Sequence, residues 1–242
     1  MSKYLNHLGQ PIGFPVPNWS PRPRPPLRPM EGTYCRVEPI NLGRHAADLY
    51  DANRKDEDGR IWTYLPYGPW DTFQGYLHWM ETNALGADPM FHAIVDRRTD
   101  KAVGVAGYMR INPDDGVIEV GHINYSPLLQ RTPAGTEAMF LMMRRVFDEL
   151  GYRRYEWKCD ALNAPSRAAA ERLGYQFEGV FLQATMYKGR SRDSAWFAII
   201  DKEWPAIKAA FERWLDPSNF SEQDRQRQRL SILTAKARDG TV

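Results

Sequence analysis

The residues with the clearest capacity for chemistry lie in one stretch, from Glu119 to Ala138. Its first part alternates polar and apolar residues, as a half-buried strand does, and it carries the carboxylate of Glu119. Its second part is a turn, from Gln130 to Gly135, that leads into a helix starting near Gly135 and holds no acidic side chain. A helix start has unpaired N–H groups and the positive end of the helix dipole. The stretch therefore combines a candidate general base with a candidate site for an anion such as a diphosphate.

This stretch resembles the core motif of the GCN5-related N-acetyltransferase (GNAT) superfamily, whose turn is usually written Q/R-x-x-G-x-G/A. Gln130 and Gly135 match it, whereas Pro133 stands where the family usually has glycine. The following T-E-A at 136–138 and the I-E-V-G-H strand at 118–122 are similar to the RimJ/RimL-like branch. The resemblance covers residues 31–203 and implies an acetyl-coenzyme A-dependent acetyltransferase.

On this resemblance we expect the turn to bind the pyrophosphate of acetyl-CoA through its backbone N–H groups. Gly135 would let the backbone approach the ligand closely, and Arg131 would add charge. The pantetheine arm would pair with the strand, where a backbone N–H would polarise the thioester carbonyl. Pro133 has no N–H, so one donor of the usual set is missing. The expected cofactor-binding residues are Ile123, Asn124, Tyr125, Gln130, Arg131, Thr132, Ala134, Gly135, Thr136, Asn163 and Ser166.

Glu119 is the expected general base for an acetyl transfer to an amine. It precedes Gln130 by eleven positions, and the histone-acetylating members of the superfamily place their base glutamate at a matching position. A carboxylate there can take the amine proton directly or through water. Strand alternation puts Glu119 on the same face as Gly121 and Ile123, unless a bulge intervenes. The alternative is that the Glu119 carboxylate has a structural role, positions another site residue, or is solvated at the start of the strand.

Asn163 and Ser166 form a second candidate pair, with a spacing that resembles the N-x-x-S of RimJ/RimL-like enzymes. By that resemblance Asn163 bonds the pantetheine, and Ser166 lies near the sulfur, where it could protonate the leaving thiolate. Many other members use a tyrosine at the position of Ala170, so here Ser166 or water must serve as the acid. Physical chemistry alone favours a helix N-cap for Asn163 and a first-turn serine.

An aromatic, proline-rich loop at 61–70 is the expected wall of the acceptor site. Exposed aromatic residues on loops often line ligand sites, and the resemblance places such a wall between the first two helices. We expect Tyr64, Tyr67 and Trp70 to bind the substrate, because ring faces attract an approaching ammonium by ~1 kcal/mol. The alternative is a plug that fills the core.

Hydrophobic periodicity and turn residues predict the elements that position these groups. Their order implies an α+β fold that is GNAT-like, with a mixed, mostly antiparallel sheet, flanking helices and a splayed central strand pair. The Met-rich stripe between Met139 and Leu150 is interpreted as core. The expected strands are 34–38, 90–96, 102–111, 117–125, 155–161, 177–187 and 194–200, and the expected helices are 44–53, 71–83, 135–150, 163–174, 204–215 and 221–235.

The chain divides into a proline-rich N-terminal arm at 1–30, a GNAT-like domain at 31–215 and a charged C-terminal tail at 216–242. The arm is interpreted as a disordered leader or a strap over the domain, with a PxxP ligand for an aromatic groove as the alternative. The tail is a free extension or an oligomer contact, and a homodimer stays open.

Composition narrows the class of protein. A net charge of +2 over 242 residues gives no support for a nucleic-acid partner. Cys35 and Cys159 are too few and too distant in sequence for a disulfide framework, which suits a reducing, cytoplasmic compartment. No run is long enough for a membrane helix, and the histidines show no metal-ligand spacing. The expected partner is a small-molecule or peptide amine; a GNAT-fold acyl-CoA-binding or sensor protein without turnover, or a scaffold, are the alternatives.

Overall fold

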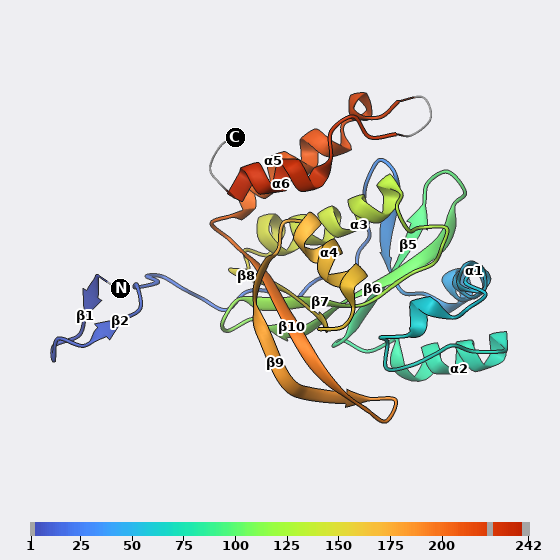
Figure 1. The fold of residues 1–242 in the computed structure, drawn as a ribbon, viewed down its shortest axis with the longest axis horizontal. Coiled ribbons are helices and arrows are strands. Elements are labelled where there is room, and N and C mark those ends of the chain that lie inside the picture. The colour runs from blue at the N-terminus through green and yellow to red at the C-terminus, as the bar shows by residue number, and fades with distance from the viewer. Residues whose placement is uncertain (1–2, 222–224, 239–242) are drawn as a thin grey trace.

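The computed structural model describes residues 3–221 and 225–238. At its centre lies an eight-stranded sheet with the order β3-β4-β5-β6-β7-β8-β10-β9 (Figure 1). All neighbouring strands are antiparallel except β7 and β8, which are parallel. The strands are β3 (Met30–Glu31), β4 (Cys35–Pro39), β5 (Met90–Asp96), β6 (Lys101–Asn112), β7 (Val117–Tyr125), β8 (Arg154–Asp160), β9 (Gln176–Tyr187) and β10 (Arg190–Ile200).

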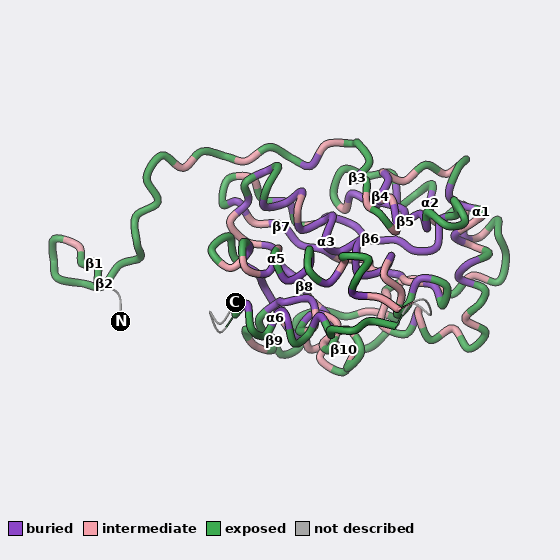
Figure 2. The backbone as a smooth tube through the Cα atoms, turned by 90° about the horizontal axis from the view of Figure 1, so that it is seen from above, coloured by how far each residue is buried: buried purple, intermediate pink, exposed green. Residues whose placement is uncertain are grey.

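Helices cover both faces of this sheet, so its central strands are buried on both sides (Figure 2). One face packs against α1 and α2 through Leu49, Tyr76 and Met80. The other face packs against α3, whose Met139, Met142 and neighbours form the core stripe expected from the sequence. The helices are α1 (Leu42–Asn53), α2 (Phe73–Asn83), α3 (Pro133–Arg144, continued by a π turn at Arg145–Glu149), α4 (Ala164–Arg172), α5 (Trp204–Leu215) and α6 (Leu230–Arg238).

The parallel pair β7 and β8 separates along its length. Residue pairing between them runs from Val117 opposite Arg154 to Val120 opposite Trp157 and then stops. β7 nevertheless continues to Tyr125 and β8 to Asp160, so the two strands diverge toward their C-terminal ends. The α+β fold with a mostly antiparallel sheet and a splayed central pair is therefore confirmed. The split matters because it leaves backbone groups of β7 without a strand partner on the β8 side.

Several element boundaries differ from the sequence-based ones, each for a local reason. α2 is capped by Thr72, whose hydroxyl accepts from the Gly75 N–H, and not by Asp71. Phe73 is consequently 38% exposed, and Tyr76 is buried in its place. α3 begins at Pro133, because Thr132 is the N-cap and proline fits the first helical turn. β10 begins at Arg190, directly after a tight hairpin turn.

The two terminal segments differ in how they meet the domain. Residues 3–14 hold a small hairpin of β1 (Tyr4–Leu5) and β2 (Pro11–Ile12), which extends away from the body (Figure 2). Residues 19–30 lie along the body as a strap, since Trp19 Nε1 donates to the Asp114 carbonyl at 2.6 Å and the buried Arg145 donates to the carbonyls of Arg28 and Pro29.

The C-terminal segment is also part of the packed structure. The helix expected at 221–235 begins only at Leu230, and residues 222–224 lie outside the described part of the chain. Leu230 and Leu233 are buried in the same core cluster as α5, so α6 packs on the domain although the segment around it is highly charged. The division of the chain at residues 30 and 215 stays a prediction.

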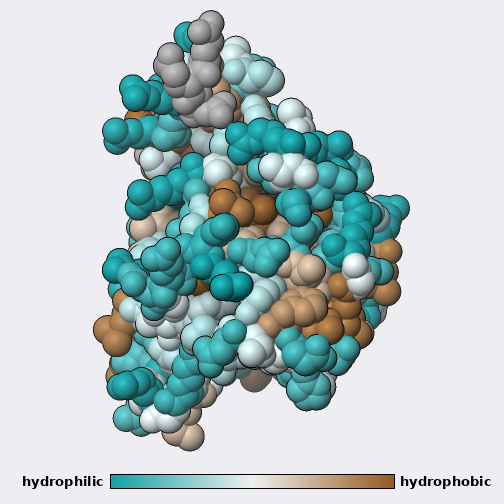
Figure 3. Space-filling model, turned by 90° about the vertical axis from the view of Figure 1, so that its right-hand side faces the viewer, coloured by the Kyte–Doolittle hydropathy of each residue, from teal (hydrophilic) through white to brown (hydrophobic). Residues whose placement is uncertain are grey.

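Seen from the side of α1 and α2, the surface is mainly hydrophilic, with hydrophobic side chains gathered in small patches (Figure 3). Among residues 3–221 and 225–238, no helix has the length and apolar character that crossing a membrane requires.

Stability is expected to fall as the pH is lowered from 6.5 to 4, because of His92 in β5. Burial, reinforced by the nearby Arg145, lowers the pKa of His92 from 6.5 to about 4. Below pH 6.5 the unfolded chain therefore binds a proton at His92 that the folded chain does not bind. This difference lowers the free energy of unfolding by up to about 3 kcal/mol at pH 4. Urea unfolding at pH 7 and 4.5 measures this loss, which should shrink in His92→Leu and persist in the exposed control His78→Gln. An equal loss in both variants would contradict the assignment.

Candidate active site

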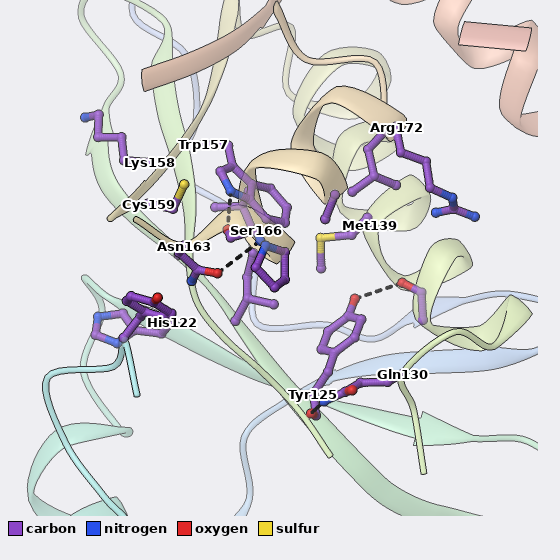
Figure 4. A pocket seen from close by; sticks show the side chains of 18 of the residues that line it. His122, Tyr125, Gln130, Met139, Trp157, Lys158, Cys159, Asn163, Ser166 and Arg172 are labelled. Atoms are coloured by element: carbon purple, nitrogen blue, oxygen red, sulfur yellow. Dashed lines mark hydrogen bonds between the residues drawn. The ribbon is translucent and has the colours of Figure 1, made fainter. Parts of the chain in front are cut away.

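A single large cleft of about 1700 Å³ runs through the split between β7 and β8. One end, the cofactor half, is formed by the turn at 130–136, by Arg172 and by residues 225–229. The other end, the acceptor half, is formed by Glu119, by Lys158 and by the hairpin strands β9 and β10. Figure 4 shows Gln130 and Arg172 of the cofactor half on the side of the cleft opposite Lys158 of the acceptor half. The structure thus brings the two chemical features of the 119–138 stretch into one continuous site.

In the cofactor half, hydrogen bonds from side chains in the turn and from Tyr125 hold the conformation of the turn. Gln130 Nε2 donates to the Tyr125 carbonyl at 2.8 Å, and the Tyr125 hydroxyl donates to the Gly135 carbonyl at 2.8 Å. Thr132 Oγ1 accepts from the Gly135 N–H at 3.1 Å as the N-cap of α3. Ala134 is buried and does not line the cleft with its side chain.

The turn offers fewer free donors than the sequence suggested. The N–H groups of Thr132 and Thr136 are directed at carbonyls within the turn, and Pro133 has none. Among the described residues, none accepts from the N–H groups of Arg131 and Ala134. These two donors, with the helix dipole of α3, make the turn a small anion site.

In the middle of the cleft, β7 contains a bulge. Val105 pairs with Asn124 and Gly107 with Gly121, so β7 has one residue more than β6 between these pairs. His122 accommodates it with a φ of 50°, in the left-handed region. The side chains of β7 therefore do not alternate strictly between the two faces of the sheet from Glu119 to Tyr125. The alternation expected from the sequence depended on the absence of such a bulge.

The bulge decides which side chains face the cleft. Ile123 and Tyr125 line it, whereas the buried Asn124 side chain lines a small second cavity among the aromatic residues beside α2. The expected role of Asn124 in cofactor binding can therefore involve only its backbone. Beyond Val120 that backbone lies along the split, where β8 no longer pairs with it.

Asn163 and Ser166 meet Cys159 at the centre of the site (Figure 4). Asn163 Oδ1 accepts from the Ser166 N–H at 3.1 Å and so caps α4, as physical chemistry alone favoured. Ser166 Oγ accepts from Trp157 Nε1 at 3.0 Å, and its own proton can be donated to the neighbouring Cys159 sulfur or to a ligand. Burial raises the pKa of the Cys159 thiol, which agrees with an inert buried cysteine.

Glu119 is buried in the acceptor half and held by two cations. Its Oε1 accepts from Arg110 Nη1 at 2.7 Å, and its Oε2 lies 2.8 Å from Lys158 Nζ. Lys158 also lies 2.9 Å from Glu156 and sits 3.7 Å above the ring of Trp196. The Glu119 carboxylate lines the cleft. Its Oε2 is already paired with a primary ammonium, that of Lys158.

The aromatic loop divides between wall and core. Tyr64 lines the cleft, and its hydroxyl donates to the Leu162 carbonyl at 3.1 Å. Tyr67 stacks on His122, with its hydroxyl 3.0 Å from His122 Nδ1, and Trp70 packs between Trp62 and Trp79. Tyr67 and Trp70 do not line the cleft, so for these two the structure favours the alternative of a core plug.

His122 was not singled out as a site residue from the sequence, although it lines the cleft next to Gly121. Burial, together with the charge of Arg110, lowers its pKa to about 4. At neutral pH its imidazole is therefore uncharged and can accept a proton or a hydrogen bond.

Sequence reasoning also missed most of the basic residues of the cleft. Arg225, Arg227 and Arg229 come from the C-terminal segment and line the cofactor half. Arg172 joins them from the end of α4 and donates to Thr136 Oγ1 at 3.1 Å. No local motif marks Arg225, Arg227 and Arg229, because their segment meets the turn only through the packing of α6. Within residues 3–221 and 225–238, no group of side chains is arranged to hold a metal ion.

Comparison with known proteins agrees with this geometry. The chain is similar to a GCN5-related N-acetyltransferase from Brucella melitensis, with 44% identity and a TM-score of 0.89, over 91% of this chain and 100% of that one. It is 28% identical over 116 residues to the uncharacterized N-acetyltransferase p20 of Bacillus licheniformis, which covers 46% of this chain. That match spans 62% of the length of the relative.

A RimL protein is among the solved structures that share the fold. The ribosomal-protein α-N-acetyltransferase RimL, solved in complex with coenzyme A, shares the fold with a TM-score of 0.57 at 17% identity, over 72% of this chain and 99% of that one. The family described as "Acetyltransferase (GNAT) domain" matches residues 36–176. The chain therefore belongs to the GNAT acetyltransferase family, with RimL-like proteins among its structural relatives.

Proposed function

We propose that this protein transfers the acetyl group of acetyl-CoA to a primary amine, by direct attack in a ternary complex. One observation carries the proposal. A single cleft passes through the split between β7 and β8 and joins an anion-binding turn to a buried carboxylate, Glu119. A thioester laid along this cleft would present its carbonyl between the two halves, where an amine can reach it from the acceptor half.

The cofactor half would hold the phosphates of CoA. The N–H groups of Arg131 and Ala134 and the positive end of α3 suit the pyrophosphate. The guanidinium groups of Arg225, Arg227 and Arg229 supply further positive charge close by. RimL, which shares this fold, is known with coenzyme A bound, and this supports the same ligand here.

The pantetheine arm would lie along β7 beyond Val120, as an added strand whose partners are the free backbone groups. A backbone N–H near the bulge at His122 would donate to the thioester oxygen and stabilise the negative charge that develops there. Ser166 would lie close to the sulfur and can donate its hydroxyl proton to the leaving thiolate.

In this mechanism Glu119 receives the proton of the amine, directly or through water. The amine nitrogen attacks the thioester carbonyl, the new N–C bond forms as the C–S bond breaks, and CoA leaves as the thiol. Because both oxygens of Glu119 are engaged by Arg110 and Lys158, the incoming amine must displace or share one of these contacts.

Gly135 provides a test of the cofactor half. A Cβ at Gly135 would lie 2.8 Å from the Leu129 carbonyl and 3.1 Å from the Tyr125 ring, so Gly135→Ala must shift the turn. Acetyl-CoA at 100 times its Kd should stabilise the wild type by about 2.7 kcal/mol, or several degrees in Tm. A tenfold loss of affinity in the variant would remove about 1.4 kcal/mol of that gain.

The chain offers a matched control for this experiment. Gly75 occupies the same third position of α2, and its N–H donates to Thr72 Oγ1 at 3.1 Å, as that of Gly135 does to Thr132. Gly75→Ala should keep the full CoA-induced rise in Tm. If neither acetyl-CoA nor CoA raises the Tm of the wild type while ATP is also without effect, the proposed function fails.

A second candidate is an acyl-CoA-binding or sensor protein without turnover. Pro133, which removes one N–H from the turn, and the double pairing of Glu119 favour it. Release of free CoA thiol in the presence of an amine separates the two. Steady release above the rate without amine supports the acetyltransferase, and CoA binding without release for any amine supports the sensor.

A further inference from the structure

Arg192 in β10 lines the acceptor half of the cleft without a partner. It is half-buried, its Nε is shielded from solvent, and among the described residues its guanidinium makes no hydrogen bond or ion pair. The other acceptor-half arginines are engaged: Arg110 pairs with Glu119, and Arg60 pairs with Asp58. A partly desolvated guanidinium without an acceptor is costly, so its natural partner is an anion that enters with a ligand.

The strand register places Arg192 beside the reacting centre. Ser194 and Trp196, which follow it at alternate positions of β10, also line the cleft and lie opposite Asp160 and Lys158 of β8. The positive charge of Arg192 reaches Cys159 and Tyr187, where it opposes the rise in pKa that burial causes at both groups. Arg192 therefore lies at the end of β8, close to where the thioester sulfur is expected.

Hydrogen bonds connect the segments that wall the cleft around Arg192, and we call this part of the cleft the enclosure. The Tyr64 hydroxyl donates to the Leu162 carbonyl, and Lys188 Nζ donates to the Trp62 carbonyl at 2.8 Å, so the aromatic loop contacts both the β8–α4 turn and the β9–β10 hairpin. Tyr187 donates to Asp160 Oδ2 at 2.9 Å across the same opening. These contacts bound the acceptor half on the side of the aromatic loop and of the β9–β10 hairpin.

The charges of this enclosure are distributed unevenly along β8 and β10. At one end Glu119 lines the cleft, pairs with the Lys158 ammonium and suits a second cationic amine. At the other end Arg192 is a cation without a counterion. Trp196, whose ring lies under the Lys158 ammonium, and Arg192 are four residues apart on β10, or about 13 Å between Cα atoms at the usual rise of a strand. The arrangement is complementary to a molecule that carries both an amine and an anionic group.

We infer that the acceptor is a small amine that also carries an anionic group, a carboxylate or a phosphate, and that Arg192 binds this group. The inference rests on the acetyl transfer proposed above and specifies its acceptor. Guanidinium pairs with both kinds of oxyanion through two parallel hydrogen bonds. A free amino acid has the required pattern. The N-terminal α-amine of a protein lacks it, because its carboxyl is consumed in the first peptide bond.

Paired acceptors test this inference. Initial rates of CoA release would be measured for the twenty amino acids and for their carboxamides, which keep the amine and lose the charge. O-Phosphoethanolamine and ethanolamine form the phosphate pair. For the best pair, kcat/KM of the wild type should favour the anionic member by about 10- to 100-fold, the range for a charge-assisted bidentate pair. The pair that shows the preference identifies the anionic group.

Variants assign the preference to Arg192. Arg192→Gln should raise KM for the anionic acceptor and bring the ratio within each pair close to one, whereas Arg192→Lys should keep part of it. Arg190→Gln is the matched control, because Arg190 is exposed on the same strand and does not line the cleft. It should keep the full ratio. The CoA-induced rise in Tm shows that each variant is folded with an intact cofactor half.

The outcomes separate this inference from the proposed function. Equal rates for the anionic and the neutral member of every pair, or turnover of no pair by a protein that binds CoA, overturn the inference. An equal loss of kcat for charged and neutral acceptors in Arg192→Gln also overturns it, because Arg192 would then act on the thioester. Absence of CoA binding in the wild type is a failure of the proposed function itself.

Discussion

Replacement of Glu119 by glutamine is expected to lower kcat by about 10²- to 10⁴-fold, the usual contribution of a general base. Glutamine keeps the shape of the side chain but cannot take the proton of the amine. The loss should be smaller at high pH, where more of the acceptor is already unprotonated, since a lysine-like amine has a pKa of about 10.4. The CoA-induced rise in Tm should be preserved, because Glu119 lies in the acceptor half.

Glu156→Gln is the control for this experiment. Glu156 lies opposite Glu119 on β8, is similarly buried, and pairs with the same Lys158 at 2.9 Å, but it does not line the cleft. It should retain most of the activity if Glu119 acts on the amine. Equal losses in the two variants would show that Glu119 serves only to hold Lys158, and unchanged turnover of Glu119→Gln across the pH range would remove it from the mechanism.

Glu137→Gln is expected to destabilise the protein by about 3 kcal/mol, the loss of hydrogen bonds to a buried charged group. The Glu137 carboxylate accepts from three consecutive backbone N–H groups, those of Thr33, Tyr34 and Cys35, at 2.6–2.8 Å. It thereby fastens α3 to the start of β4. In the glutamine side chain one acceptor oxygen is replaced by an NH₂ donor that faces these N–H groups. The remaining oxygen still accepts, but without the negative charge that strengthens its hydrogen bonds.

Thermal and urea unfolding would measure this effect. The Tm should fall by about 6–12 °C for a chain of this size. Glu171→Gln is the control, because Glu171 is exposed on α4, and it should change stability by less than about 0.5 kcal/mol. A loss below about 1 kcal/mol in Glu137→Gln would mean that water or another acceptor replaces the carboxylate.

The sequence was most informative where structure depends on neighbouring residues. β5, β7 and α5 have the bounds that periodicity and turn residues predicted. The N-cap of α4 at Asn163 and the Met-rich core of α3 were also readable, because capping and amphipathic spacing are local properties. Errors of a few residues arose where two capping residues compete, as with Asp71 and Thr72.

The tertiary structure decided the partners of the site residues. The bulge at His122, which turns Asn124 away from the cleft, depends on the register between β6 and β7. The pairing of Glu119 with Lys158 depends on the register between β7 and β8. Neither register can be predicted from the sequence of one strand alone, because each is set by packing on both faces of the sheet.

The sequence by itself determined the family, the fold class and the stretch that holds the turn and the carboxylate. Only the tertiary structure showed that Arg192 of a distant hairpin enters the same cleft as that carboxylate with no partner among the described residues, and that Arg225, Arg227 and Arg229 line the other end. The physical reason is that a local motif fixes the shape of a backbone segment, whereas the charge of a cleft is the sum of side chains that the fold brings together from segments far apart in the chain.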